Sequence, residues 1–375
     1  MIRFVVLIIA MFMMLWGDDN ITDDTNESNQ TQELYIDQVT SGLDSMHEYV
    51  SHKLKVFSSN VDAELSDLAC ELDEDNTTIG RKTKYRCEHN ASASMSEYVS
   101  DFFRDETFLD VNNRSYLRMR LGSEFSEKEA PLWQLALNFN LNLPYAKDSL
   151  NLFVGEDVED EISEKLPTPE ANDPSFGLRY FIPDVVENFK SNFTVGTRGI
   201  NPYARIYARY NIDYADWRIY PIQEIEYRGD NTMQQWGYYE RTRFYFDRKI
   251  AKREMVRFML YRSTEEEKFG QRYGAVAAYF NTLTSKHIGY SGYLSVGGDS
   301  RFYKNNPNYL PKRYEHSGID TYRIGSVLKQ RLYKEWLFYE IEPIVDWSRQ
   351  YHFDHNAIIK FNLEFWFGDV RKIDL

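Results

Sequence analysis

The sequence lacks the features that define several large classes of protein. A mean hydropathy of −0.58 with 42% hydrophobic residues excludes a bundle of membrane-spanning helices. Basic residues are not in excess, because 44 lysines and arginines stand against 58 aspartates and glutamates, so no nucleic-acid surface is expected. The chain has no nucleotide-binding, cofactor-binding or energy-coupling motif. We therefore expect no cofactor, no metal site and no catalytic activity.

Long hydrophobic runs are also missing, with one exception near the start. The run "FVVLIIAMFMMLW" follows Arg3 and precedes "GDDN". It is short for a helix that crosses a bilayer, and it fits the apolar part of a secretory signal peptide, which we place at residues 1–17. An uncleaved inner-membrane anchor is the alternative, since no A-x-A cleavage site precedes Asp18.

Charge and aromatic residues divide the remaining chain into two parts. Up to Asn112 there are 22 acidic against 8 basic residues, whereas the rest has 36 of each. Aromatic residues show the opposite distribution, with 24 of 28 tyrosines and 18 of 24 phenylalanines after Asn112. We therefore divide the chain into an acidic, partly helical segment at 18–112, a second domain at 113–368 and a C-terminal tail at 369–375.

The second part repeatedly alternates apolar and polar residues, which is typical of β-strands. In "IIKFNLEFWFG", residues 358–368, isoleucine, leucine and phenylalanine alternate with lysine, asparagine and glutamate. The pattern predicts 14 strands, within a range of 12–16. Their predicted bounds are 115–122, 132–143, 149–156, 175–182, 192–199, 202–212, 216–228, 233–247, 252–263, 268–283, 287–297, 317–331, 335–347 and 355–367.

These strands are longer than those of a soluble sandwich, which average about five or six residues. A transmembrane barrel needs strands of about 9–11 residues, with apolar side chains outward, polar ones inward and aromatics near both interfaces. The sequence therefore predicts an all-β antiparallel barrel in the outer membrane of a Gram-negative cell. Short and long connections alternate, which indicates that both termini and the segment 18–112 lie in the periplasm.

Alternation also assigns charged residues to the barrel interior. In a diffusion pore, opposed basic and acidic walls would create a transverse field, and in a closed barrel they would interlock as salt bridges. The predicted interior residues are Arg118, Arg120, Arg205, Arg209, Arg218, Arg241, Arg243, Arg257, Arg323, Arg331, Glu224, Glu226, Asp247, Glu340, Glu342 and Glu364.

The order of "RSYLRMRL", "YARIYARY", "WLFYEIEP" and "FNLEFWFG" resembles a group of uncharacterised, porin-like outer-membrane β-barrel proteins of proteobacteria. The resemblance spans roughly residues 96–368 and implies fold and location. The last strand also resembles the C-terminal signal that the barrel assembly machinery recognises, although "GDVRKIDL" follows Phe367.

The acidic segment contains a helical stripe and the only two cysteines. Apolar residues recur every three or four positions over 33–68, which predicts an amphipathic helix that forms a coiled coil, docks on a partner or packs on its own neighbour. In an oxidising periplasm, Cys70 and Cys87 are expected to form a disulfide rather than a metal site.

Five N-x-S/T sequons lie in the acidic segment, and each has an acidic residue two positions earlier. This resembles the extended acceptor sequence of bacterial periplasmic N-glycosylation, although chance in an acidic, asparagine-rich segment is the alternative. The candidate asparagines are Asn20, Asn26, Asn29, Asn76 and Asn90.

The sequence predicts a porin-like channel for passive diffusion of small hydrophilic solutes, with outer-membrane lipid and the barrel assembly machinery as partners. A closed structural or adhesion barrel that acts through its loops is the alternative. An outer-membrane phospholipase is less favoured, because adjacent His316 and Ser317 would point to opposite faces of a strand. The solute and the oligomeric state are not specified by the sequence.

The predicted disulfide can be tested by intact mass. Mature protein alkylated without reductant should show no added alkyl groups at Cys70 and Cys87. The same protein alkylated after reduction is the control and should gain two groups. Two groups gained without reductant would exclude the bond.

Overall fold

The computed structural model describes residues 41–61, 115–142, 150–155, 165, 175–182, 188–230, 235–251, 253–266, 268–282, 288–300, 302–303, 318–334 and 336–368. The chain divides into two compact units, Met1–Tyr49 and Val50–Leu375. Several predictions lie outside the described residues. They are the signal peptide at 1–17, the disulfide Cys70–Cys87, the sequons at Asn20, Asn26, Asn29, Asn76 and Asn90, the pair His316 and Ser317, and the tail at 369–375.

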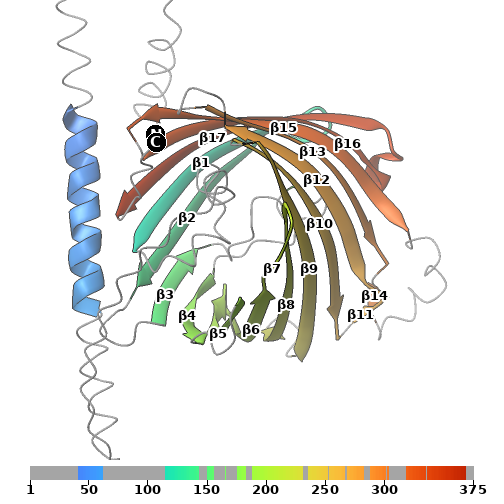
Figure 1. Ribbon diagram of the computed structural model, residues 1–375, viewed down its shortest axis with the longest axis horizontal. Coiled ribbons are helices and arrows are strands. Elements are labelled where there is room, and N and C mark those ends of the chain that lie inside the picture. Colours follow the sequence, from blue (N-terminus) through green and yellow to red (C-terminus); the bar gives the residue numbers. More distant parts are fainter. Residues whose placement is uncertain are drawn as a thin grey trace, which may run out of the picture. The chain divides into compact units, whose positions relative to one another are not determined.

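The strands of the second unit form one closed antiparallel sheet, and the predicted fold is confirmed (Figure 1). Neighbours in sequence pair with each other, and the ring closes where β1 pairs with β17 and β6 pairs with β8. Fourteen strands make the ring within the described residues, with β6 and β7 (Ile212–Tyr214) counted as one interrupted strand. They are β1 (Tyr116–Ser126), β2 (Leu132–Asn142), β3 (Leu150–Gly155), β4 (Ser175–Ile182), β5 (Phe189–Arg198), β6 (Asn201–Tyr210), β8 (Trp217–Asp230), β9 (Gln235–Ala251), β10 (Glu254–Glu265), β12 (Arg272–Thr282), β13 (Ile288–Asp299), β15 (Ile319–Tyr333), β16 (Leu337–Ser348) and β17 (His355–Gly368).

Each of the 14 predicted strands is present, but some bounds were wrong. The strand predicted at 202–212 is interrupted at Asn211, and the one predicted at 268–283 is broken before β12. The second break occurs at Gly270, whose φ of +85° is readily adopted only by glycine. Before it, β11 (Lys268–Phe269) leaves the barrel and pairs with β14 (Phe302–Tyr303) in a separate two-stranded sheet.

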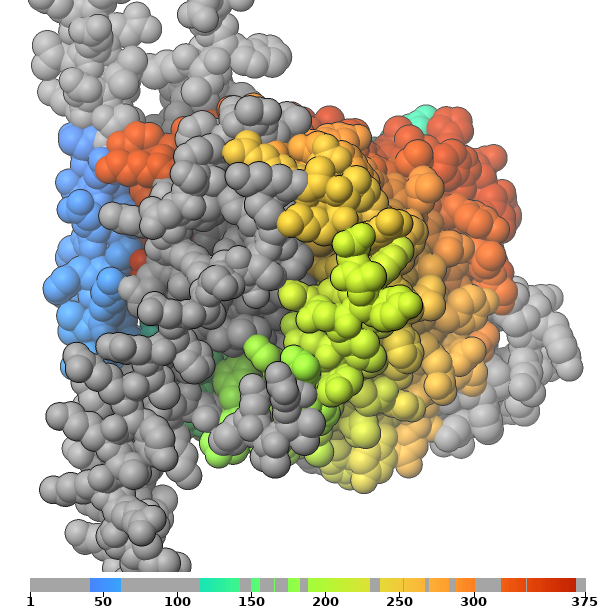
Figure 2. Space-filling view, viewed as in Figure 1, coloured from blue at the N-terminus to red at the C-terminus, as the bar shows by residue number. Residues whose placement is uncertain are grey.

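The outer face of the barrel is apolar. Alternation places large side chains such as Trp133, Leu135 and Leu294 outward, and they are 74%, 60% and 58% exposed. In Figure 2 the strands from β8 to β16, coloured yellow to red, pack side by side into a continuous surface. The described outer face therefore presents apolar side chains to its surroundings around much of the ring.

The strands on either side of the two longest connections meet them at one end of the barrel. Because consecutive strands are antiparallel, β3 and β13 end, and β4 and β15 begin, at the same end as the turn between β16 and β17. That turn contains the 3₁₀ helix η3 (Arg349–Tyr351). A hydrogen bond from the Tyr351 hydroxyl to the Glu129 carboxylate raises the pKa of Tyr351 to about 12. This contact joins the β16–β17 turn to the connection between β1 and β2.

A helix spans residues 41–61, within the predicted amphipathic stripe. Its residues from Val50 onward belong to the barrel unit and cover the outer face of β1 to β3. Leu54 is buried against Leu141, and Ser51 accepts a hydrogen bond from the Gly368 amide at 3.0 Å. No helix among the described residues is long and apolar enough to cross a membrane.

Glycine at position 368 is required by this packing. Its φ is +99°, and a Cβ there would lie 2.5 Å from the Ser115 carbonyl oxygen and 2.7 Å from a methyl group of Leu54. The last residue of β17 therefore fits closely between the first strand and the helix. Ser58 and Ser115 add a second polar contact, with their hydroxyl oxygens 3.0 Å apart.

Replacing Leu54 should release residues 50–61 from the barrel wall. Truncation of a buried leucine costs roughly 2 kcal/mol, which is about 30-fold in an opening equilibrium. We expect Leu54→Ala to raise the rate of proteolysis within 50–61 by that order, while the barrel keeps its heat-modifiable gel mobility. Val56→Ala is the control, since Val56 is 42% exposed. Equal cleavage rates for the two variants would contradict the packing.

Candidate functional site

The interior face of the barrel is the candidate functional site, because it gathers charged side chains from most of the strands. The register places all the charged residues named from the sequence on this face. Most of them are buried, and Arg120, Arg218, Arg323 and Arg331 are partly exposed. They are Arg118 and Arg120 on β1, Arg205 and Arg209 on β6, Arg218, Glu224 and Glu226 on β8, Arg241, Arg243 and Asp247 on β9, Arg257 on β10, Arg323 and Arg331 on β15, Glu340 and Glu342 on β16, and Glu364 on β17.

The acids of β8 and β9 are held by arginines of neighbouring strands. Arg257 meets Asp247 through two hydrogen bonds, Nε to Oδ1 at 2.7 Å and a terminal nitrogen to Oδ2 at 2.8 Å. The Tyr220 hydroxyl donates a third bond to Asp247 at 2.9 Å. Further along the same two strands, Glu224 accepts a hydrogen bond from Arg243 and forms an ion pair with Arg241 at 3.4 Å. Because strands pair side by side, these ion pairs run along the wall rather than across the barrel.

A second group of ion pairs lies where the two ends of the barrel sequence meet. Glu364 on β17 contacts Arg118 of β1 at 3.2 Å and Lys329 of β15 at 3.3 Å. It also accepts a hydrogen bond from the Trp366 indole. A buried carboxylate with two basic partners and an N–H donor is fully compensated. This cluster therefore fastens three strands together, including the pair that closes the ring.

One residue that lies outside the strands, Lys165, contacts side chains of the interior wall. Lys165 lies between β3 and β4, yet its Nζ is 2.9 Å from the Glu342 carboxylate on β16 and 5.7 Å from the Tyr293 ring on β13. Its carbonyl oxygen accepts a hydrogen bond from Ser295 on β13 at 2.8 Å. In the strand order, β13 stands opposite β4. Lys165 therefore contacts the wall that stands opposite β4.

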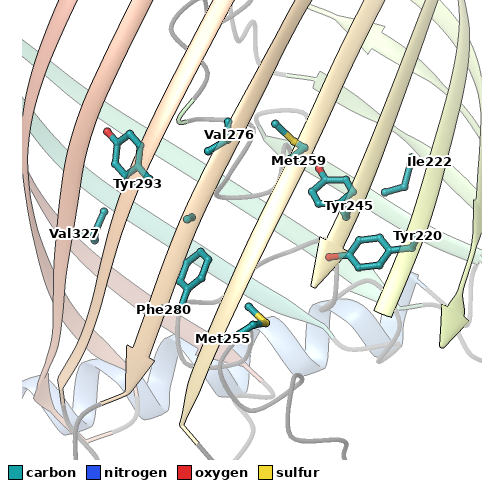
Figure 3. Close-up of a cluster of buried hydrophobic side chains, with 10 residues drawn as sticks. Tyr220, Ile222, Tyr245, Met255, Met259, Val276, Phe280, Tyr293 and Val327 are labelled. Carbon is teal, nitrogen blue, oxygen red and sulfur yellow. The ribbon is translucent and has the colours of Figure 1, made fainter. Parts of the chain in front are cut away.

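Part of the interior wall is apolar. Tyrosine, methionine and aliphatic side chains from β8, β9, β10, β12, β13 and β15 form a buried cluster on neighbouring strands, as Figure 3 shows. The cluster contains Tyr220, Ile222, Tyr245, Met255, Met259, Val276, Ala278, Phe280, Tyr293 and Val327. The general barrel pattern places polar side chains inward, so this apolar part of the wall departs from that pattern.

Several interior groups were missed from the sequence. Arg179 on β4, Arg272 on β12 and Lys329 on β15 are buried at positions that the same alternation would have indicated. Lys165 gave no such signal, because it lies in a connection without periodicity. Among the described residues, ten lysine and arginine side chains and seven carboxylates are buried. Bases are therefore in excess inside the barrel.

Comparisons with known proteins give likenesses in structure but not in sequence. No protein family matches the chain, and no curated protein matches it. A loop-deletion mutant of OmpT, an outer membrane protein of Vibrio cholerae, aligns at 8% identity and a TM-score of 0.41, covering 68% of this chain and 98% of that one. The outer membrane protein OprD of Pseudomonas aeruginosa aligns at 7% identity and a TM-score of 0.41, covering 69% and 94%. A KdgM porin aligns at 8% identity and a TM-score of 0.32, covering 66% and 98%. The assignment of the fold rests on the strand pairing of this chain itself.

Removing Arg257 should destabilise the barrel strongly. Arg257→Met leaves the Asp247 carboxylate buried without its bidentate partner, which costs about 3–5 kcal/mol. The double variant Arg257→Met with Asp247→Asn should recover much of the loss. The measurement is the urea midpoint of heat-modifiable mobility.

The control pair for this experiment is only partly buried. Arg218 meets Asp213 at 3.0 Å, with side chains 26% and 65% exposed. Arg218→Met should therefore cost less than about 1 kcal/mol. Equal losses of stability for the two variants would contradict the prediction that burial makes the ion pair of Arg257 the stronger contributor.

Proposed function

We propose that the protein resides in the outer membrane and forms a porin-like channel for small hydrophilic solutes. Two properties support a membrane location: the closed sheet leaves no strand edge unpaired, and the outer face exposes large apolar side chains. In water such a surface would aggregate, whereas in a bilayer it meets acyl chains. The segment before the barrel would then lie in the periplasm, on the side where β1 begins and β17 ends.

The observation that carries the channel function is the charged interior. Apolar side chains fill most of the interior of soluble proteins, whereas this interior buries lysine, arginine, aspartate and glutamate. The ion pairs lie between neighbouring strands, as with Arg257 and Asp247. Side chains that lie along the wall leave the centre of a wide barrel for water and solute. Small hydrophilic molecules are the substrates that such a lining fits.

The Lys165 crossing narrows this passage. It joins a connection at one end of the barrel to Glu342 and Ser295 on the opposite wall. A solute can therefore pass only if these contacts break, or through the space that remains beside them. A crossing of this kind restricts the size of solutes and adds a positive charge at the constriction.

A second candidate is a closed barrel that acts through its surface loops. Dense interior packing favours it, since Arg257 is 2% exposed and both Tyr245 and Met259 are 0% exposed. In such a closed barrel the ion pairs would join neighbouring strands and fill the interior.

Assembly of the barrel would use the last strand. Phe361, Leu363, Phe365 and Phe367 share the outer face of β17, in register with β1. This alternation supports recognition by the barrel assembly machinery. Ion pairs of structural type hold Arg241, Arg243 and Arg257, so we propose no catalytic role for these side chains.

Conductance in planar bilayers separates the two candidates. The purified, folded protein should give stepwise openings, and Lys165→Ala should give larger steps because the contact with Glu342 is lost. Lys128→Ala is the control, since Lys128 lies outside the interior, over the Tyr351 ring. Folded protein that never conducts would contradict the channel and favour the closed barrel. Equal conductance steps in all three proteins would show that Lys165 does not narrow the passage.

A further inference from the structure

A groove with a volume of about 570 Å³ lies on the outer face of the barrel, across β10 to β16. Its floor is formed by Ala275 and Ala277 of β12. Leu260 and Phe258 of β10 stand in register with these alanines on one side, and Leu294 of β13 stands in register with Ala277 on the other. Two short side chains between longer ones therefore hollow the apolar wall.

The groove opens to the outside of the barrel and not into its interior. Leu260, Leu294 and Tyr322 line it and are 50%, 58% and 46% exposed. Met259 and Val276 also border the groove, but they point inward and are 0% and 2% exposed, so their side chains do not form its open surface. The groove is therefore separate from the charged interior.

The width of the groove suits one unbranched chain. Leu260 and Val296 stand two strands apart with Ala275 between them, so their backbones are about 10 Å apart before their side chains narrow the space. An α-helix with its side chains is about 10–12 Å across, so it does not fit between them. Every strand of the described ring already has two neighbours, so the groove cannot take up a further strand. An acyl chain is the narrow apolar group that a bilayer offers to this face.

A basic residue stands at one end of the groove. Along β12 the next outward residue beyond Ala275 is Tyr273, which is in register with the exposed Arg262 of β10. The Arg262 Nε donates to the neutral amide of Gln271 at 3.0 Å, and a guanidinium has four further N–H donors. Glu240, the acid of β9 on the same face, accepts hydrogen bonds from an amide and a hydroxyl group instead. Arg262 therefore suits an anion at the end of the groove.

Aromatic residues lie toward the same end. Tyr322 of β15 and Trp347 of β16 are in register with each other and line the groove, and Tyr273 stands beside Arg262. Tyrosine and tryptophan gather where the apolar core of a bilayer meets the headgroups. Since β10 ends at Glu265, Arg262 lies close to the rim of the barrel. The groove thus runs from headgroup level toward the apolar core of the bilayer.

We propose that the groove binds an acyl chain of a membrane lipid whose negatively charged phosphate group pairs with Arg262. The proposal rests on the outer-membrane location proposed above and does not need an open channel. The lipid belongs to the leaflet at the end of the β16–β17 turn, because β10 ends and β12 begins there. The apolar lining shields the acyl chain from water, while the guanidinium gives the phosphate charge-assisted hydrogen bonds.

Native mass spectrometry of the folded protein in a non-ionic detergent tests the site, with dimyristoylphosphatidylglycerol as the probe. The protein should retain this lipid, and Ala275→Leu with Ala277→Leu should lower the retained fraction severalfold because the new side chains fill the groove. The control, Ala204→Leu with Ala208→Leu, enlarges two outward alanines that alternate with inward arginines on β6, and it should leave retention unchanged. Equal retention in the two variants would overturn the groove as the lipid site.

Arg262→Gln tests the headgroup and leaves the groove unfilled, so it serves if the leucine variant lacks heat-modifiable mobility. It should lower retention of dimyristoylphosphatidylglycerol severalfold but leave retention of dimyristoylglycerol, which has no phosphate, unchanged. Arg248→Gln is the control, since Arg248 is an exposed residue near the opposite end of the barrel, where β9 ends. Equal retention of phosphatidylglycerol by the two arginine variants would overturn the pairing with phosphate.

Two further results separate the lipid site from the proposed location and from another occupant. Native protein found in the soluble periplasm would overturn the outer-membrane location and, with it, a membrane lipid as occupant. Protein that resides in the outer membrane but retains no phosphatidylglycerol would overturn the lipid site alone. A dimer mass that Ala275→Leu with Ala277→Leu abolishes would assign the groove to a second copy of the chain and overturn the lipid.

Discussion

Closure of the sheet is the constraint on which the rest of the structure depends. In the ring, every barrel strand has a neighbour on both sides, through ladders that include β1 with β17 and β6 with β8. With no free edge, backbone groups are satisfied within the sheet, and side chains alternate strictly between outside and inside. A slip of one residue in β17 would turn Glu364 outward and Phe365 inward. The closed register therefore fixes which residues can meet.

The same register determines which interior charges can pair. Arg257 stands directly across from Asp247 in the β9–β10 ladder, and Lys329 stands across from Glu340 in the β15–β16 ladder. Residues in register on adjacent strands lie side by side. Most described ion pairs therefore link strands that are one or two places apart in the ring. Lys165 differs, since it arrives from a connection and reaches the opposite wall. The contact of Lys165 with Glu342 can therefore form or break while the pairing between the barrel strands stays unchanged.

Strand alternation made most of the fold predictable, because a continuous apolar outer face demands apolar residues at every second position. Bounds failed where local geometry overrides that pattern, as at Gly270 and Asn211. The apolar interior wall was missed because "RYGAVAAYFNT" in β12 has apolar side chains on both faces. The sequence also could not predict which charged residues form ion pairs. Glu364 lies far from Arg118 in sequence and contacts it only because the ring closes between β1 and β17.

A count of charges over the barrel part of the chain conceals how the charges are arranged. That part has 36 acidic and 36 basic residues, so its net charge suggests no preference for either sign of ion. Position matters more than the sum, because an adjacent acid and base act at a distance as a dipole, whose field decays faster than that of a single charge. The register decides which charges are adjacent, since Arg257 stands across from Asp247 and Arg205 stands across from Glu226. The field inside the ring therefore depends on the strand pairing and not on the composition alone.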